Sequence, residues 1–372
     1  MEAAHSLTAY LQHQLEADLP FVIYRKPDSS TIQGFFQEDQ TLHYAGDLSQ
    51  SGFVFAPFDD HEKAIIIPGE QAQELHIKGS AEIHAIDTPF DASTLVADKA
   101  QHIELVKKGI NTIKSSELKK VVLSRKQQLK TNKSTEEILL QLLHDHPKAF
   151  VYCWYHPKIG LWLGATPETL VSIANRQLRT MSLAGTQAFL GTNDVMWGDK
   201  ELEEQQMVTQ TIVSRLEPLL GSLRVSEVQT HRAASLLHLK TDITGAVDLT
   251  TVSLKDIVEA LHPTPAVCGL PKNLAQQFIL ENEQYKRAYY TGFLGELNLK
   301  SARSRARNRR NVENLAYTSI SSNSHLFVNL RCMQLREDTA FVYVGGGITA
   351  ASDPLAEWIE TVNKLTTMGA VL

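Results

Sequence analysis

The sequence predicts an α+β fold in which helices flank antiparallel sheets. Between residues 150 and 187, apolar runs are separated by the short turns HPKIG, GATPE and ANR, which is typical of an antiparallel meander. Helical segments interrupt the strands elsewhere without the regular alternation of strand and helix that a parallel βαβ fold requires. The two observations together favour antiparallel sheets with helices packed against them.

The remaining elements follow from local patterns along the chain. Residues 1–95 begin with an amphipathic helix and continue with short strand-like runs between polar turns. Residues 102–116 carry apolar side chains at helical spacing, and residues 119–129 alternate and are rich in β-branched residues, which predicts a helix followed by a strand. Further helices are expected at 135–146, 200–223 and 354–368, and late strands at 325–335 and 339–347.

Composition excludes several classes of protein. The chain has 372 residues, of which 43% are apolar and 21% charged, as in globular proteins with a sizeable core. Its net charge of −6 gives no general attraction to nucleic acid. The segment 300–310 is locally basic, but it lacks the interleaved aromatic residues that stack on bases, so we expect no nucleic-acid partner.

The cysteines and the apolar segments bear on location. Cys153, Cys268 and Cys332 are far apart and form no CxxC pair, so a disulfide framework or a zinc site is not expected and a reducing compartment fits. The N-terminus lacks the pattern of a signal peptide, and no run of about 18 apolar residues is present. We therefore expect a cytoplasmic protein without a membrane span.

Two pairs of glutamates share a spacing of three residues. Glu201 and Glu204 lie in KELEEQQMV, and Glu357 and Glu360 lie in EWIETVNKL. Such pairs are common on solvated helix faces. If the two faces lined one pocket, however, their carboxylate oxygens would suit Mg²⁺.

Other residues have both an ordinary and a functional interpretation. Lys120 opens a strand, where lysines are often exposed, but in a covered cleft it could act as a base. Glu168 follows a Thr-Pro turn, and burial would allow it to act as an acid. Arg331, in the predicted strand 325–335, could pair with an acid or grip a substrate carboxylate. The glycines at 345–347 allow an anion to approach the backbone closely, although they lack the context of a dinucleotide site.

The order of the motifs adds a family resemblance. The motifs KVVLSR, LGATPE, SLAGT, KELEEQQMV, HLKTDITG, HPTPAVCGLPK, VNLRCMQL, GGGIT and EWIETVNKL, as an ordered set, resemble the chorismate-utilising enzymes. This family includes isochorismate synthases, salicylate synthases, anthranilate synthase component I and aminodeoxychorismate synthase. The resemblance covers roughly residues 98–369. It implies a four-layer α/β/β/α arrangement, with residues 1–95 as a variable N-terminal part and 96–372 as the chorismate-binding catalytic core.

The resemblance also implies roles for individual residues. Lys120 matches the general base of the family and Glu168 the general acid. The substrate is expected to be chorismate, and the positions that line its pocket in family members are Gly185, Thr186, His238, Thr241, Arg331, Gly345, Gly346 and Lys364.

The glutamate pairs match the metal site of the family. Glu204 and Glu360 match the ligands of one Mg²⁺, which binds the ring carboxylate of chorismate, and Glu201 and Glu357 match the supporting acids. One departure is Gln205, because many relatives have a histidine directly after the metal-binding glutamate.

The resemblance favours one member of the family without excluding others. Lys120 and the loop at Pro265, Ala266 and Val267 resemble the isochorismate synthases. This implies an isomerase that adds water at C2 of chorismate and expels the C4 hydroxyl, in menaquinone or siderophore biosynthesis. The alternatives are a salicylate synthase, which also eliminates pyruvate, an aminating enzyme, and a binding protein without catalysis. Family members are often monomers, so we expect a monomer or a weak homo-oligomer.

Overall fold

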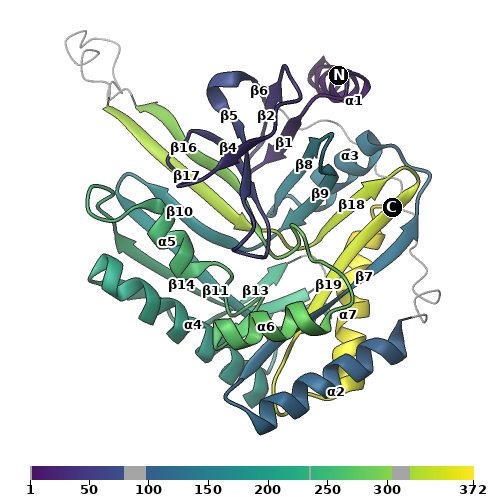
Figure 1. Ribbon diagram of the computed structural model, residues 1–372, viewed down its shortest axis with the longest axis vertical. Coiled ribbons are helices and arrows are strands. Elements are labelled where there is room, and N and C mark those ends of the chain that lie inside the picture. Colours follow the sequence, from purple (N-terminus) through teal and green to yellow (C-terminus); the bar gives the residue numbers. More distant parts are fainter. Residues whose placement is uncertain (1, 79–97, 234–235, 304–318) are drawn as a thin grey trace.

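Two large antiparallel sheets form the centre of the molecule, and helices lie on their outer faces (Figure 1). The computed structural model describes residues 2–78, 98–233, 236–303 and 319–372. Within these ranges one sheet has nine strands. In spatial order they are β15 (Gly269–Leu270), β7 (Lys120–Lys130), β19 (Thr339–Ile348), β18 (Cys332–Arg336), β9 (Gly160–Thr166), β8 (Phe150–His156), β1 (Phe21–Arg25), β2 (Thr31–Gln37) and β6 (Ala72–Lys78).

The other sheet has ten strands within the described ranges. In spatial order they are β12 (Leu223–Val225), β14 (Leu236–Ala246), β11 (Gln177–Ala188), β10 (Thr169–Ala174), β17 (Ser319–Val328), β16 (Phe293–Arg303), β4 (Gly52–Ala56), β5 (Ala64–Pro68) and β3 (His43–Ala45), with β13 (Gln229–Ala233) paired to β14. The predicted meander is present, but it is shared: β8 and β9 belong to the first sheet, whereas β10 and β11 belong to the second.

An aromatic core fills the space between the two sheets. Phe150 of the first sheet stacks on Phe327 of the second with ring centroids 4.2 Å apart, and Trp154 lies 4.7 Å from Phe55 across the same interface. All four rings are buried. Because alternate residues of a strand point to opposite faces, the sheets present these aromatic rings inward and aliphatic residues outward to the helices.

The helices cover the outer faces and complete four layers, which confirms the predicted α/β/β/α order. Leucine and isoleucine side chains of α1, α3 and α7 pack on the first sheet, and those of α4 and α5 pack on the second. α2 and α6 pack against β7 near its start. The helices are α1 (Glu2–Glu16), α2 (Lys99–Ser115), α3 (Thr135–Asp145), α4 (Asp199–Leu220), α5 (Leu254–Leu261), α6 (Lys272–Asn282) and α7 (Pro354–Gly369), with a short 3₁₀ turn at Gly69–Gln71.

Local sequence fixes where α7 begins. Asp353 is its N-cap residue, and the side chain accepts a hydrogen bond from the backbone N–H of Ala356 at 2.8 Å. Pro354 follows at the first helical position, where its missing N–H costs nothing. Such a cap stabilises a helix by about 1 kcal/mol. It fixes the register at which the helix presents Glu357 and Glu360.

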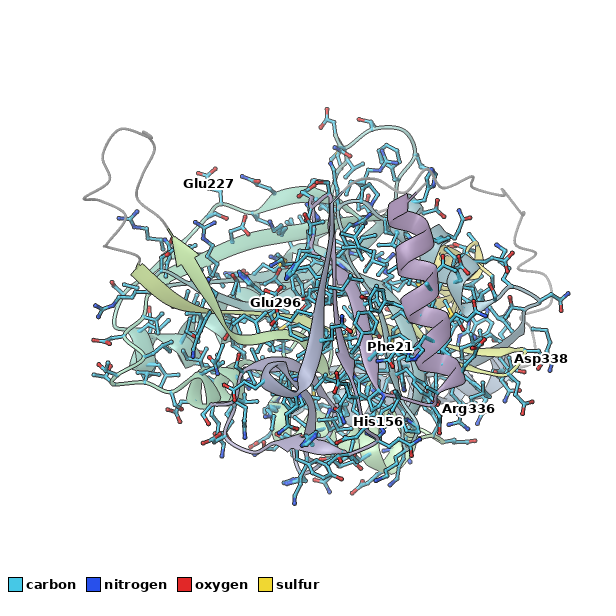
Figure 2. The ribbon with its side chains drawn as sticks, turned by 90° about the horizontal axis from the view of Figure 1, so that it is seen from above. Phe21, His156, Glu227, Glu296, Arg336 and Asp338 are labelled. Atoms are coloured by element: carbon cyan, nitrogen blue, oxygen red, sulfur yellow. The ribbon has the colours of Figure 1, made fainter. Side chains whose placement is uncertain are left out.

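The N-terminal strands extend both sheets rather than forming a separate sheet. β1 pairs with β8, and β4 pairs with β16. α1 lies against the start of β1, where Phe21 packs in one core with Leu7 and Leu11 (Figure 2). Glu296, near the centre of Figure 2, accepts a hydrogen bond from Tyr24 at 2.8 Å and joins the two sheets. The boundary near residue 95 stays a prediction, because residues 79–97 lie outside the described ranges.

One strand prediction is wrong. The expected strand 325–335 is divided between β17 in one sheet and β18 in the other. The break follows Asn329, a buried residue whose side chain bonds to Tyr152 and to the carbonyl of Tyr289, and Arg331 adopts a left-handed backbone with φ of 49°. Arg331 therefore lies in the link between the sheets.

Two further expectations concern the surface and the membrane. Most of the basic segment 300–310 falls in residues 304–318, which lie outside the described ranges. In the parts of the chain that are described, every helix is too short or too polar to cross a membrane.

Candidate active site

A polar cleft gathers most of the predicted site residues. It encloses about 940 Å³ of space, the open solvent at its mouth included. Its walls come from β7, β11, β14 and β19, from α4 and α7, and from the loops after β9 and β17. The predicted residues that line it are Glu168, Gly185, Thr186, Glu201, Glu204, His238, Arg331, Gly345, Gly346, Glu360 and Lys364.

Three predicted residues lie behind this lining. Lys120 is 1% exposed and contacts Glu204 of the lining, while Glu357 is 2% exposed. Thr241 accepts a hydrogen bond from the amide of Gln205 at 3.2 Å and does not reach the cleft surface. The predicted contact between Thr241 and a substrate is therefore not supported by the position of Thr241 behind the lining. Gln205, the departure from the family pattern, has instead a packing role between α4, β11 and β14.

Glu204 and Glu360 each form an ion pair with a lysine. Lys120 Nζ lies 2.8 Å from Glu204 Oε1, in an ion pair that lacks the angle of a hydrogen bond. Lys364 donates to Glu360 at 2.7 Å and also to the carbonyl of Gly345 at 2.9 Å. Two lysine–glutamate ion pairs therefore lie at the cleft. These lysines pair with the two carboxylates that the family resemblance assigns to the metal.

A third lysine, Lys200, was not singled out from the sequence. It donates to Glu357 Oε1 at 2.7 Å and lines the cleft. It stands at the start of the KELEEQQMV stretch, one turn before Glu204. One face of α4 therefore carries both a proposed metal ligand and a lysine that pairs with Glu357 of α7. Tyr290 and Tyr343 also line the cleft. Only its place beside the glycine run in a late strand could have indicated Tyr343 from the sequence.

The glycine run in β19 is where carboxylates approach the backbone. Gly345, Gly346 and Gly347 pair with Ser124, Leu123 and Val122 of β7. A Cβ atom on Gly347 would lie 2.6 Å from Glu204 Oε1, and one on Gly346 would lie 3.3 Å from Glu357 Oε2. A larger residue at Gly347 would therefore displace the Glu204 carboxylate, whereas one at Gly346 would press only lightly on Glu357.

Glu168 is a buried acid without an ion-pair partner among the described residues. It is 3% exposed, in the turn between β9 and β10, and its backbone carbonyl accepts a hydrogen bond from Val328 N–H at 3.0 Å. Burial raises the pKa of Glu168 to about 8, although the charges of Lys120 and Lys364 oppose the rise. At neutral pH the side chain therefore holds its proton and can donate it.

His238 and Arg331 form a hydrogen-bonded pair on another wall. His238 Nδ1 lies 2.8 Å from the carbonyl of Gly185, so this nitrogen carries the proton and Nε2 accepts from Arg331 Nη2 at 3.2 Å. Burial and the charge of Arg331 lower the pKa of His238 to about 3, which keeps the ring neutral. Burial lowers the pKa of Arg331 to about 10, so its guanidinium remains charged at neutral pH. Arg331 is thus a fixed cation suited to a carboxylate.

The donor set of the glutamates fits a hard divalent cation. Glu357 Oε2 is buried and has no hydrogen-bond partner in the part of the chain that the structure describes. Burial and the charge of Glu360 raise the pKa of Glu357, although the ion pair with Lys200 opposes the rise, so Glu357 would gain from a further positive charge. Carboxylate oxygens alone suit Mg²⁺ or Ca²⁺ rather than softer metals. The four glutamates do not converge as a ready-made cage, however: in the described ranges the only close grouping of metal-type ligands is Asp59, Asp60 and His61.

The fold and the cleft define an α+β protein whose two sheets and helices bring lysines, carboxylates and an arginine around one polar cavity. A family model described as chorismate binding enzyme matches residues 56–302, and a second one with the same description matches residues 315–370. The chain therefore belongs to the chorismate-binding enzyme family.

Named relatives and solved structures agree with this family. The chain is 30% identical over 288 residues to isochorismate synthase MenF of Escherichia coli strain K12, covering 74% of this chain and 61% of the relative. It is 28% identical over 283 residues to isochorismate synthase DhbC of Bacillus subtilis, covering 71% of this chain and 65% of the relative. The match thus spans less than two thirds of the length of either relative.

The solved structures extend the similarity of fold to nearly the whole chain. The Bacillus anthracis structure titled putative 2,3-dihydroxybenzoate-specific isochorismate synthase has a TM-score of 0.75 at 23% identity, covering 95% of this chain and 96% of that one. Escherichia coli MenF gives 0.72 at 22% identity, covering 95% and 88%. Anthranilate synthase component I of Streptococcus pneumoniae gives 0.64 at 18%, covering 94% and 90%. At these identities the likeness shows the fold.

Proposed function

We propose that the chain is an isochorismate synthase, a Mg²⁺-dependent isomerase that converts chorismate to isochorismate. The observation that carries the proposal is the presence in one site of a buried lysine amine, Lys120, and a buried carboxyl group, Glu168, with a pKa of about 8. A base and an acid held in a shared low-dielectric site are what a hydroxyl exchange on a ring requires. Relatives that carry the name isochorismate synthase support the same activity.

The exchange consumes one water and releases another. A water oxygen attacks C2 of chorismate, and Lys120 takes one of its protons. The ring double bonds shift, the bond from C4 to its oxygen breaks, and Glu168 donates the proton with which this oxygen leaves as water. Lys120 can accept a proton only as the free amine, which requires Glu204 to exchange its ion pair with Lys120 for another partner.

The remaining residues hold the substrate. The guanidinium of Arg331, oriented by His238, would bind a chorismate carboxylate, and Gly185, Thr186, Gly345, Gly346 and Lys364 would contribute polar groups around the ring. Glu204 and Glu360, supported by Glu201 and Glu357, would hold Mg²⁺. When bound, the ion would neutralise the ring carboxylate of chorismate.

The location and assembly of the protein are also proposed. All three cysteines are buried free thiols, which fits a reducing compartment such as the cytoplasm. We propose a monomer or a weak homo-oligomer, serving menaquinone or siderophore biosynthesis.

The direct test is incubation of the purified protein with chorismate and Mg²⁺, followed by identification of the product. We expect isochorismate, and we expect a chelator to abolish its formation until Mg²⁺ is restored. Pyruvate in step with an aromatic product would indicate a salicylate synthase, and an ammonia-dependent amine would indicate an aminating enzyme. Unchanged chorismate in the presence of Mg²⁺ would contradict the proposal and favour a binding protein.

A glycine in the cleft gives a second test of the metal site. Gly347→Ala should weaken Mg²⁺ binding by about tenfold or more, the scale seen when a contact that supports a metal ligand is lost. The reason is that the new methyl group would lie 2.6 Å from Glu204 Oε1 and 3.0 Å from Lys120 Cε. Mg²⁺ titrations followed by the melting temperature and by turnover would measure the shift.

Gly46→Ala is the matched control, because a Cβ at Gly46 would meet no atom within 4 Å. It should bind Mg²⁺ as the wild type does. Equal Mg²⁺ dependence for Gly347→Ala and wild type would mean that Glu204 does not hold the metal.

A further inference from the structure

A second cavity lies beside β7, and its lining shares no residue with the lining of the proposed active site. It encloses about 1190 Å³, the open solvent at its mouth included. Its walls come from the first turns of α2, from Ser124, Arg125 and Lys126 of β7, and from the segment 282–285 after α6. β15 pairs with the first two residues of β7, and beyond it the backbone N–H of Ser124 donates to Glu283 Oε1 at 2.8 Å.

Arg125 is a buried cation with an unused donor in this wall. It is 5% exposed, its Nε donates to Thr361 Oγ1 at 2.9 Å, and its Nη1 donates to Gln127 Oε1 at 2.7 Å. Nη2 is buried and has no hydrogen-bond partner among the residues that the structure describes. Across the described ranges no carboxylate forms an ion pair with Arg125. A buried guanidinium without a counter-charge is expensive, so the site is missing an anion.

His102 and the start of α2 face the same cavity. His102 is 3% exposed, and within the described ranges neither ring nitrogen has a hydrogen-bond partner. α2 begins at Lys99, and the side chain of its N-cap residue, Asp98, accepts no hydrogen bond from the first turn. The free N–H groups and the dipole at a helix N-terminus favour an anion.

Two acids also line the cavity and do not fill this role. Glu104 is paired with Lys107 at 2.7 Å. Asp98 acts on Arg125 only through its charge, from beyond ion-pair distance. Lys108 and Lys126 lie in the same lining, so cations outnumber these two acids.

We propose that this cavity binds a small oxyanion, the carboxylate or phosphate group of a small molecule, through Arg125 Nη2, His102 and the first turn of α2. The anion would supply the acceptor that Nη2 lacks, and a neutral imidazole would donate one further hydrogen bond. Carboxylate and phosphate oxygens both accept charge-assisted hydrogen bonds from a guanidinium N–H, so the two chemistries share this recognition.

The bound anion would lie next to the helix that carries the proposed metal ligands. The Arg125 guanidinium stacks 4.3 Å from the ring centroid of Trp358 and donates to Thr361. These two residues flank Ile359 and Glu360 on α7, and Glu357 directly precedes Trp358. Occupancy of the cavity is therefore coupled to the position of α7, and Trp358 is a natural reporter of it.

The test measures binding without chorismate or Mg²⁺, so its outcome is independent of the proposed function. Protein labelled with 5-fluorotryptophan is titrated with inorganic phosphate and, separately, with succinate at constant ionic strength, and Trp358→Phe assigns the fluorine resonance of Trp358. We expect a saturable shift of that resonance with at least one probe. Arg125→Gln should weaken binding about tenfold or more, as the loss of a charge-assisted hydrogen bond predicts.

Two further variants decide the remaining outcomes. His102→Leu should also weaken binding, and it decides the question if Arg125→Gln does not fold. Arg331→Met, which removes a cation of the other cleft, should leave the shift intact. A shift with phosphate alone or with succinate alone identifies the preferred group. No saturable shift with either probe, a shift unaffected by the Arg125 and His102 variants, or one abolished by Arg331→Met would overturn the proposal.

Discussion

Replacing Lys120 with methionine is expected to lower kcat by about 10²–10⁴-fold while the chain stays folded. The methionine keeps an unbranched apolar stem in the space that the 1%-exposed lysine occupies, but it removes the only group proposed to take the proton from water. Turnover of chorismate measures the loss, and circular dichroism checks the fold. Lys119→Met, at the exposed neighbouring position just before β7, is the matched control and should keep wild-type turnover.

Lys120→Arg separates a base from a simple counter-charge. Arginine can still pair with Glu204, which lies 2.8 Å from the lysine nitrogen, but it cannot act as a base because it stays protonated. We therefore expect the arginine variant to be as slow as the methionine variant. If arginine restored turnover, Lys120 would serve only to neutralise Glu204, and the proposed base would be wrong.

Local sequence was sufficient for the elements that carry these residues. The alternation from residue 119 predicted the strand that became β7, and the helical spacing from residue 354 predicted α7. The placement of Glu204 and Glu360 in one cleft came from the motif resemblance, since helical spacing alone fits a solvated face equally well. Spacing along one helix cannot tell which face another helix will approach.

Long-range pairing explains what the sequence did not predict. β1 pairs with β8 across more than a hundred residues, and nothing in either strand specifies its partner. The break at Arg331 depends on Asn329, which is anchored by Tyr152 and Tyr289 from elsewhere in the chain. Arg331 therefore looked like the centre of one strand, whereas it lies at the corner where the chain passes between sheets.

The sequence did not reveal the unused Nη2 of Arg125 for the same reason. A strand arginine in KVVLSR is ordinary by sequence, and only the approach of Trp358 and α2 from distant segments buries it. The lysine partners of the glutamates could not be predicted for the same reason, because the ion pair between Lys120 and Glu204 joins β7 to the distant helix α4. Electrostatic relations of this kind appear once the fold is assembled, because they depend on distance and burial rather than on neighbours in the chain.

Replacing Glu168 with glutamine is expected to lower kcat by about 10²–10⁴-fold, because the amide keeps the shape of the side chain but has no acidic proton to donate. The residue is 3% exposed, and no ion pair with it forms in the described ranges, so the change should not release a charge elsewhere. Steady-state turnover measures the effect. Because the group acts in the acid form, wild-type activity should also fall as pH rises through about 8.

The same carboxyl group makes a prediction about stability. Burial raises the pKa of Glu168 from 4.5 to about 8, so the folded chain binds this proton more tightly than the unfolded chain does. Its contribution to the free energy of unfolding is full below pH 4.5 and is lost as pH rises through about 8. The stability of the wild type relative to Glu168→Gln should therefore decline across this window and level off above it. Melting temperatures of both proteins at matched pH values test this, and parallel curves would show that Glu168 is ionised in the folded protein at neutral pH and cannot be the acid.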